Sequence, residues 1–283
     1  MDISNKRLTE FRKLIYSHYE KEGRQFPWRI NTNDPSNAWG ILVSELMLQQ
    51  TQTSRVVVYW ERWMEKWPTA DLLNKAPLEE VLKEWSGLGY NRRARYLKEC
   101  ASIIARDLGG KVPENPKDLE KLPGIGPYTA GAIACFAYNF PSVFIETNIR
   151  SVIIHFFFLN MEAVTDREIM PVIDTVMDRS NPRKWYWSLM DYGAALKKSG
   201  SNPNRRSAHY NKQSAFNGSL RQIRGSIVRS LVTVGPATAE SLGNEIRKNL
   251  GNSVKEEDLY RAIKALIKES LVAEEDGKYK IKK

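Results

Sequence analysis

The sequence predicts an all-α body followed by a small C-terminal domain. Up to about residue 215 it is a succession of amphipathic segments separated by Gly and Pro, with little sustained period-two alternation. After Ser219 the pattern changes to three short helical segments and then two extended ones around Asp276-Gly277, a hairpin signal. Three helices and a terminal hairpin form a winged-helix pattern. At 283 residues the chain exceeds the usual ~100–200 residues per domain, so two or three lobes are expected.

The helices can be placed in order from their apolar periodicity and from the residues that begin and end each segment. In the body they are predicted at Leu8–Glu22, Ala38–Thr51, Gln52–Trp67, Thr69–Asn74, Pro77–Trp85, Asn91–Asp107, Pro116–Lys121, Tyr128–Tyr138, Asn148–Phe158, Asp166–Ser180 and Pro182–Leu196. In the C-terminal domain they are predicted within residues 221–235, 236–251 and 254–270.

Composition restricts the class of protein. The N-terminus is charged throughout, and no apolar run approaches the roughly 18–20 residues that a membrane span needs, so a protein of the cytoplasm, associated with the nucleoid, is expected. A monomer is also expected. Cys100 and Cys135 lie in apolar helical patterns with no second pair nearby. They predict neither a disulfide framework nor a metal site, and both are expected in the core.

Positive charge is concentrated in one region of the chain. The formal net charge is +10, and the stretch from Tyr192 to Ala239 contains Lys and Arg but no Asp or Glu. A block of one sign with interspersed aromatic and polar residues favours a partner lined by phosphates. The alternative is a solvated linker.

The most specific short motif is LPGIGPYTAG at residues 122–131. Its two glycines let the backbone turn tightly between helices and expose N–H groups at the start of the next helix, where the helix dipole favours an anion. A helix-hairpin-helix holds a phosphate in this way, and it grips a nucleic-acid backbone without reading sequence. A purely structural turn is the alternative.

Two carboxylates flank this motif in the sequence. Glu45 precedes an apolar run, where lost hydration favours the protonated acid, and Glu146 ends another. Taken alone, Glu146 is expected to satisfy the first N–H groups of a helix. Together, two carboxylates in different environments suit the cleavage of a glycosidic bond, because one protonates the leaving group while the other supports the positive sugar.

These residues resemble the helix-hairpin-helix (HhH-GPD) DNA glycosylase superfamily and, within it, the MutY-type A/G-specific adenine DNA glycosylases. The matching pieces, in order, are FPWR, SELMLQQTQ, GLGYNRRAR, LPGIGPYTAGAI, ETNIRSV and MDYGA, which cover roughly residues 20–196. The resemblance implies a two-lobed body. One lobe is residues 1–31 plus 144–218, the other is the six-helix barrel lobe at 32–143 with the hairpin, and the winged helix follows at 219–283.

The resemblance also implies catalytic residues. Glu45 matches the general acid that protonates the purine ring, and Glu146 stands where the family has Asp. Tyr128 matches a tyrosine near the catalytic carboxylate, at a position where bifunctional relatives have a Schiff-base lysine, so a monofunctional glycosylase is expected. Asn148 matches a polar support of the site.

Other residues are implied to bind double-stranded DNA that carries a mismatched or damaged base. Gln49 and Gln50 match residues inserted beside the vacated base, Tyr90 matches an aromatic wedge, and Arg24 matches a polar support. Flipping a base costs a few kcal/mol, which such wedges help to offset. The remaining expected DNA contacts are Gly124, Ile125 and Gly126 of the hairpin and Lys197, Lys198, Arg205, Arg206 and Lys212 of the basic segment.

The sequence departs from the family in three ways. Glu146 is one methylene longer than the family's Asp. The family's four iron–sulfur cysteines would follow MDYGA, but none is found there, so no cofactor and no metal are expected, and packing and hydrogen bonds must hold that loop. A winged helix replaces the family's Nudix-like domain, and Arg261, Lys264 and Lys268 predict a second DNA grip, with protein docking as the alternative.

The expected function is base excision repair by removal of adenine opposite 8-oxoguanine or guanine. One alternative is a glycosylase for thymine or uracil opposite guanine, or for hypoxanthine, because the tyrosine in GPYT also resembles that of thymine mismatch glycosylases. Another alternative is a non-catalytic protein that binds DNA structures, which the presence of both Glu45 and Glu146 disfavours.

Overall fold

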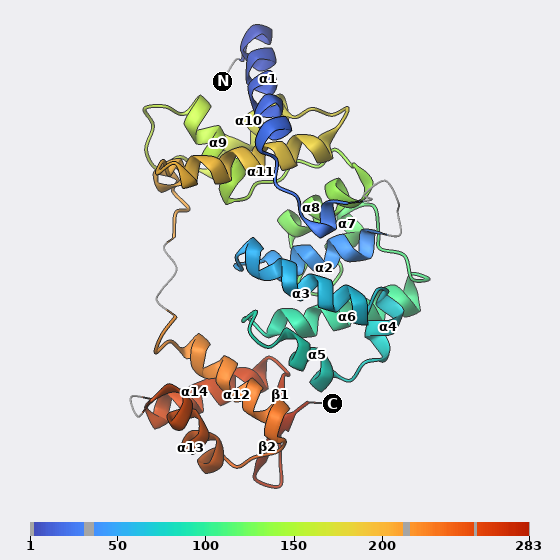
Figure 1. Cartoon of the computed structure of the whole chain (residues 1–283), viewed down its shortest axis with the longest axis vertical. Helices are drawn as coiled ribbons and strands as arrows, with labels where there is room; N and C mark the ends of the chain where they lie inside the picture. Colours follow the sequence, from blue (N-terminus) through green and yellow to red (C-terminus); the bar gives the residue numbers. More distant parts are fainter. Residues whose placement is uncertain (1–2, 31–36, 212–215, 252–253, 283) are drawn as a thin grey trace. The chain divides into compact units, whose positions relative to one another are not determined.

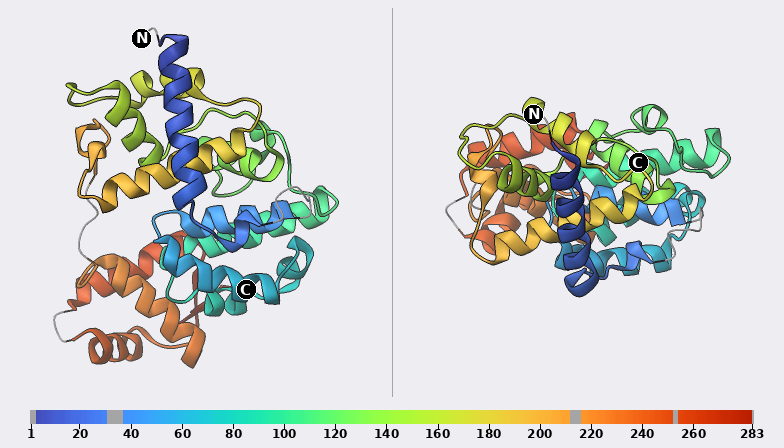
Figure 2. Two further views of the ribbon diagram at one scale, coloured as in Figure 1. Left: turned by 45° about the horizontal axis from the view of Figure 1, so that its top comes forward. Right: turned by 90° about the horizontal axis from the view of Figure 1, so that it is seen from above.

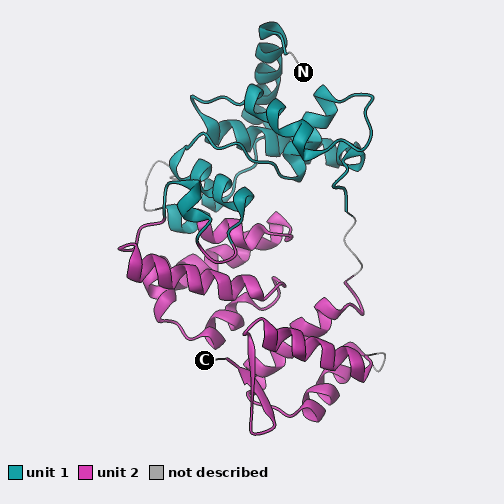
Figure 3. Ribbon diagram, turned by 180° about the vertical axis from the view of Figure 1, so that it is seen from behind, with its two compact units in different colours: residues 1–41, 113–121, 125–212 teal, residues 42–112, 122–124, 213–283 magenta. Residues whose placement is uncertain are grey.

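The computed structural model describes residues 3–30, 37–211, 216–251 and 254–282. The chain forms two compact units, each assembled from stretches that are not contiguous in sequence (Figure 3). Unit 1 comprises residues 1–41, 113–121 and 125–212, and unit 2 comprises 42–112, 122–124 and 213–283. The regular structure is helical apart from one two-stranded sheet in the described ranges, which confirms the predicted all-α body. No helix among the described residues is both long and apolar enough to span a membrane.

Unit 1 is built around one long helix, α11. Figures 1 and 2 show α11 (Pro182–Lys198) beside α1 (Asn5–Glu22) and α9 (Thr147–Phe157). Apolar residues spaced by one turn explain this packing, since Phe11 of α1 meets Trp185 of α11 with ring centroids 5.8 Å apart. The unit also contains η1 (Pro27–Arg29), α7 (Pro116–Leu119), α8 (Pro127–Tyr138), α10 (Asp166–Val176) and η3 (Pro203–Arg206).

Unit 2 contains two helical groups. The first comprises most of α2 (Ala38–Leu48), together with α3 (Thr53–Lys66), α4 (Ala70–Lys75), α5 (Leu78–Trp85) and α6 (Arg92–Asp107). The second comprises α12 (Leu220–Val234), α13 (Ala239–Leu250) and α14 (Glu256–Lys268), followed by β1 (Val272–Glu275) and β2 (Lys278–Ile281). We call residues 219–282 the C-terminal segment, and its helix α12 packs against α5.

The hairpin expected at Asp276-Gly277 is confirmed. Strands β1 and β2 pair antiparallel, with Val272 opposite Ile281 at one end and Glu275 opposite Lys278 at the turn. Asp276 has φ 51° and Gly277 has φ 71°, the left-handed conformations that a tight two-residue hairpin turn requires. The three helices predicted ahead of the hairpin are also present, while their assignment to a winged-helix domain stays a prediction.

Two predicted helices end three and four residues earlier than expected. The helix that begins at Ala38 was expected to reach Thr51 but ends at Leu48, because Gln50 adopts φ 56°, which no α-helix continues. The helix expected at Asp166–Ser180 ends at Val176. There the Asp178 carboxylate accepts hydrogen bonds from the backbone N–H and the hydroxyl of Ser180, a side-chain turn that competes with the helix. Cys100 and Cys135 are buried, as expected.

Candidate functional site

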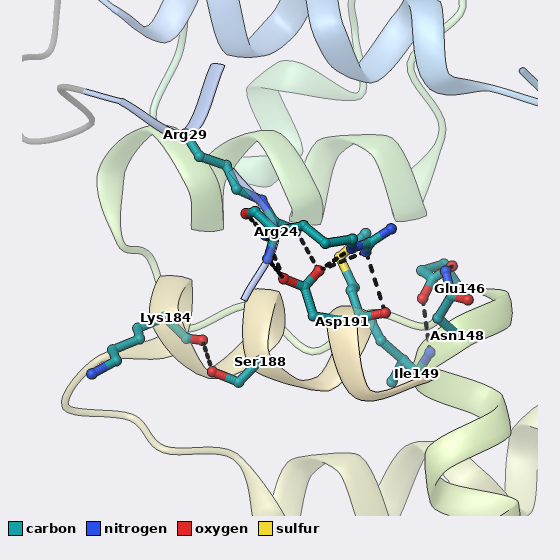
Figure 4. A network of polar contacts seen from close by, with 9 residues as sticks. Arg24, Arg29, Glu146, Asn148, Ile149, Lys184, Ser188 and Asp191 are labelled. Atoms are coloured by element: carbon teal, nitrogen blue, oxygen red, sulfur yellow. Dashed lines mark hydrogen bonds and ion pairs between the residues drawn. The ribbon is translucent and has the colours of Figure 1, made fainter. Parts of the chain in front are cut away.

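Glu146 caps the N-terminus of α9. Its backbone is extended (φ −132°, ψ 177°), and its Oε1 accepts a hydrogen bond from the Ile149 N–H at 2.7 Å. The Asn148 side-chain amide donates to Oε2 at 3.1 Å (Figure 4). The expected capping function is therefore confirmed, and Asn148 lies where it can orient the carboxylate. Capping leaves open a second function for Glu146, because a carboxylate can accept further hydrogen bonds beyond these two.

Two opposing effects act on the Glu146 carboxyl group. Burial raises its pKa above the ordinary value, since the charged form loses hydration. The backbone N–H groups of Asn148 and Ile149, then the charges of Arg150 and Arg24, oppose this and lower the pKa. Burial is the larger effect. An anion held this way stands in a partly desolvated setting, where its attraction for a positive charge is stronger than in water.

Asp191 organises the polar network beside this carboxylate. It is 2% exposed and accepts hydrogen bonds from the Arg24 Nε at 2.8 Å and from the Arg29 Nη1 and Nη2 at 2.9 and 3.1 Å (Figure 4). Both arginines come from the segment that follows α1, so Asp191 ties that segment to α11. The sequence prediction missed Asp191, although it lies in the quoted MDYGA motif. The available signal was an aspartate within the mostly apolar run at residues 185–196.

Arg24 was expected to contact DNA. Its backbone N–H and Nε donate to Asp191, and its Nη2 lies 2.6 Å from an Asp191 oxygen. The side chain is nevertheless 33% exposed, and its charge acts on the Glu146 carboxyl group. The geometry therefore makes Arg24 an electrostatic support of Glu146, while its contact with DNA stays a prediction.

Gly193 sets how closely α11 approaches α9. A Cβ at this position would lie 2.7 Å from the Cβ of Asn148 and would also meet the Asn148 carbonyl. No side chain larger than hydrogen fits there without moving one helix. The close approach brings α11 directly against the residue that orients Glu146.

The predicted hairpin has the glycine conformations that its motif implies. Gly124 adopts φ 75°, and a Cβ there would collide with the Tyr96 ring, so both the backbone conformation and the contact require glycine. Gly126 precedes α8 and its missing Cβ faces open space. Ile125 between them is buried. The N-terminus of α8 is thus open to a close approach by an anion, and phosphate binding there stays a prediction.

Tyr128 lies in the first turn of α8 and packs on Phe144, with ring centroids 5.9 Å apart at an interplanar angle of 67°. Phe144 in turn stacks on Tyr186 at 4.0 Å. The ring is thus fixed by an aromatic cluster within unit 1. A phenol at this position provides no amine for an imine, and its catalytic assignment stays a prediction.

Glu45 lies in α2, within unit 2, and is 5% exposed. The flanking Ser44, Leu46 and Met47 are fully buried. The sequence thus buries a carboxylate in an apolar helix, a costly arrangement that is more often found at functional sites than in ordinary cores. Its function as a general acid stays a prediction.

Gln50 and Tyr90, two of the expected insertion residues, share an unusual backbone conformation. Both have positive φ, 56° and 49°, which is strained for residues with a side chain. Strain of this kind persists only where surrounding contacts enforce it, and it concentrates at functional sites. Their neighbour Gln49 donates to the Gly124 carbonyl at 3.4 Å, which joins this turn to the predicted hairpin.

Arg93 enforces these conformations, and sequence reasoning missed it. It is 6% exposed, and its Nη1 donates to the carbonyls of Leu46, Met47 and Gln49 at 2.8, 2.7 and 2.6 Å. Its Nη2 donates to the Gly89 carbonyl at 3.0 Å. One guanidinium therefore joins the end of the helix that carries Glu45 to the turn that carries Tyr90. Burial lowers the pKa of Arg93 to about 10, so it remains charged at neutral pH.

Tyr90 also contacts the C-terminal segment. Its hydroxyl accepts a hydrogen bond from the Arg221 Nη1 at 2.5 Å, and the Arg221 guanidinium lies 5.3 Å from the centroid of the Tyr90 ring. The expected wedge thus has a partner in α12. No sequence signal related these two residues.

The basic segment after α11 is held by backbone and guanidinium contacts. Arg206 donates from Nη1 to the carbonyls of Phe158 and Leu159 at 2.5 and 2.7 Å, which satisfies the end of α9. Val164 and Ser207 form a parallel bridge. This geometry favours a structural function for Arg206. The expected DNA contacts Lys197, Lys198 and Arg205 are exposed, while Lys212 lies outside the described residues.

An iron–sulfur cluster does not fit these residues. Such clusters need four ligands, in most cases thiolates, whereas the two cysteines of the chain are buried in α6 and α8. Among the residues that the structure describes, no group of three or more His, Cys, Asp or Glu side chains could hold a metal ion. The expectation of no cofactor stays a prediction.

Comparison with known proteins defines the class. The chain belongs to the HhH-GPD superfamily of base excision DNA repair proteins, whose family model matches residues 43–189. This range includes both carboxylates and the hairpin. The expected superfamily is therefore confirmed.

Within that superfamily, the sequence is similar to adenine DNA glycosylases. It is 48% identical over 139 residues to the enzyme of Mycolicibacterium smegmatis, a match that covers 49% of this chain and 46% of the relative. It is 36% identical over 197 residues to that of Rattus norvegicus, covering 67% of this chain and 38% of the relative. The chain thus spans less than half the length of either relative.

The fold resembles a solved structure described as a thermostable thymine-DNA glycosylase. The TM-score is 0.59 at 29% sequence identity, and the match covers 68% of this chain and 88% of that one. The two-lobe division with boundaries at residues 31, 143 and 218 stays a prediction.

Proposed function

We propose that this protein is a monofunctional DNA glycosylase that removes adenine opposite 8-oxoguanine or guanine in double-stranded DNA. The observation that carries the proposal is sequence similarity to adenine DNA glycosylases, together with the superfamily match over residues 43–189, which contain Glu45 and Glu146. The burial of Glu45 and the fixed position of Glu146 on α9 support it.

The two carboxylates divide the chemistry. Glu45 donates a proton to the flipped adenine, so that the electron pair of the glycosidic bond leaves with a neutral base. Glu146 stabilises the positive charge that develops on the deoxyribose, and Asn148 and Arg24 keep it in place. Water then adds to the sugar carbon and gives up a proton to the Glu45 carboxylate, and the products are free adenine and an abasic site. Tyr128 provides no amine, so the strand is not cleaved.

Removal of thymine or uracil opposite guanine is a second candidate. It is supported by the fold similarity to a protein described as a thymine-DNA glycosylase and by the tyrosine in GPYT. Hypoxanthine is a further candidate on the same chemistry, because protonation of a purine ring would also release it. A protein that only binds DNA structures is less well supported, since it would have no use for a buried carboxylate at position 45.

A panel of duplexes tests these candidates directly. Each duplex carries one defined pair: adenine opposite 8-oxoguanine or guanine, thymine or uracil opposite guanine, or hypoxanthine. Abasic sites are scored after alkali, in single turnover, for the wild-type protein and for Glu45→Gln. We expect release of adenine by the wild-type protein only, no strand break without alkali, and no protein–DNA adduct after borohydride. Release of adenine at the wild-type rate by Glu45→Gln would contradict the assignment of the general acid.

The proposed substrate, DNA, indicates where in the cell the protein acts. We propose that the protein acts as a monomer on DNA in the cytoplasm, in association with the nucleoid. The exposed lysines of the basic segment, Lys197 and Lys198, support general attraction to phosphates.

A further inference from the structure

A groove lies between α12 and the turn that carries Tyr90. Two hollows, of about 590 and 710 Å³, are both lined by Tyr90 and Arg221, which are hydrogen-bonded to each other. Both are lined entirely by residues of unit 2. Gln50, Gly89 and Asn91 line both hollows, so the groove borders the proposed insertion residues directly.

The two hollows differ in charge. The smaller is lined by Arg55, Arg221 and Arg229, and no Asp or Glu is among its described lining residues. The larger contains Glu269, which pairs with Arg224. Arg229 is exposed and forms no ion pair with any described residue. Arg55 and Arg229 therefore give the smaller hollow positive charge that no described carboxylate pairs with, which suits an anion.

Small residues leave the walls of the groove accessible. A Cβ built at Gly89 or at Gly225 of α12 meets nothing within 4 Å, so the backbone is open to close approach on both walls. The side-chain amides of Gln52 and Gln222 add hydrogen-bond donors. Arginines, amides and bare backbone together are the groups that contact phosphate and sugar in protein–DNA interfaces.

We propose that this groove binds the sugar–phosphate backbone of the DNA strand opposite the excised base, through Arg55 of α3 and Arg229 of α12. The proposal rests on the proposed function. A residue that fills the space of a flipped base touches the base left unpaired on the other strand, so the groove beside Gln50 and Tyr90 meets that strand. The C-terminal segment grips DNA through Arg229 of α12, rather than through the α14 residues Arg261 and Lys264 that the sequence pattern indicated.

Charge neutralisation in the groove tests the proposal. Arg55→Gln/Arg229→Gln is compared with the control Arg261→Gln/Lys264→Gln, which removes the same charge from α14. Binding is measured on a duplex with a stable abasic-site analogue, so no base needs to be excised. Each lost phosphate contact lowers the salt slope of log affinity by about 0.9, so the groove variant should lose about 1.8. The affinity ratio of wild type to groove variant should then shrink about 12-fold between 50 and 200 mM salt.

Replacing selected phosphates of the duplex by uncharged methylphosphonates identifies which DNA strand the groove contacts. On the strand opposite the abasic analogue, they should weaken DNA binding by the wild-type protein. They should have little further effect on binding by the groove variant, because that variant has already lost the phosphate contacts. On the strand that carries the analogue, they should weaken DNA binding by the wild-type protein and by the groove variant equally. The proposal is overturned if the groove variant keeps the wild-type salt slope or if the α14 control loses as much of its salt slope. It is also overturned if methylphosphonates affect the two proteins differently only when they are on the strand that carries the analogue.

The two proposals fail separately. Loss of slope in the groove variant with no base released from any duplex would overturn the proposed function and leave the groove standing. Release of adenine with an unchanged slope would overturn the groove alone. Thermal unfolding of both variants, expected to match the wild-type protein because all four residues are exposed, confirms that the fold is intact.

Discussion

Arg93 is a single side chain on which two turns depend. Its planar fork reaches the end of α2 and the turn at Gly89 at once, and a lysine ammonium cannot reproduce that geometry. Arg93→Lys should leave buried carbonyls without donors and reduce the free energy of unfolding by about 2–3 kcal/mol. Denaturant unfolding measures this. The matched control is Arg92→Lys, an exposed neighbour that should stay within about 0.5 kcal/mol of wild type. Equal losses in both variants would contradict the positioning function.

Glu146 links stability to pH in a definite direction. Its pKa is raised in the folded protein, so the fold favours the protonated acid, and the ionised group reduces stability as pH rises through that pKa. Glu146→Gln keeps an acceptor for the Ile149 N–H and removes the charge. We therefore expect the variant to unfold at a higher temperature than wild type at pH 7, with the difference vanishing below about pH 4.

The same variant should lose activity. Removal of the anion that stabilises the sugar cation should slow base release by roughly 10²–10³-fold or more. A variant that is less stable than wild type at pH 7 and still fully active would show that Glu146 only caps α9. Glu146→Asp, which restores the shorter carboxylate of the family, is the informative companion.

The sequence identified the carboxylates Glu45 and Glu146 but missed Asp191 and Arg93, the buried residues that hold the surrounding segments in place. Glu45 and Glu146 stand out because a carboxylate next to an apolar run is unusual, and that signal is local. Asp191 and Arg93 are no less buried, but their partners are distant in sequence: Arg24 is 167 residues from Asp191. Local pattern carries no information about such pairs, so they appear only in the folded chain.

At the scale of single elements, Gly193 controls the spacing of α9 and α11. Gly193→Ala should force the helices apart at Asn148 and cost about 1–3 kcal/mol of unfolding free energy, with a slower release of base. Gly225→Ala is the matched control for stability, because its Cβ enters open space on α12 and alanine favours a helix. Its unfolding free energy should stay equal or rise by up to about 1 kcal/mol. Equal stability of the two alanine variants would contradict the close approach.

Helix starts were easier to predict than helix ends. Thr165 and Asn181 cap α10 and α11 through their side chains, and these residue types are recognisable from sequence. The ends depend on left-handed residues such as Gln50, whose conformation is enforced by Arg93 from another helix. Tertiary contacts therefore decided where α2 stops.

At the scale of the whole molecule, the C-terminal segment is bound to the rest of unit 2. Because α12 packs on α5 and Arg221 holds Tyr90, removal of residues 219–283 should lower the unfolding temperature and reduce the salt slope of DNA binding. Calorimetry and titrations at several salt concentrations measure both quantities. A truncated protein that keeps its affinity and slope would favour docking of a protein partner.

The order of the chain has a further consequence, for folding during synthesis. Unit 1 needs residues 125–212 before its first 41 residues have their partners, and unit 2 needs residues from beyond 213. At about 5–20 residues per second, Arg24 is synthesised roughly 8–33 s before Asp191. During that interval the apolar faces of α1 and α2 have no partners from the later part of the chain. Nascent chains should therefore depend on a chaperone that shields apolar segments, and ribosomes stalled before residue 191 should present α1 in a protease-sensitive form.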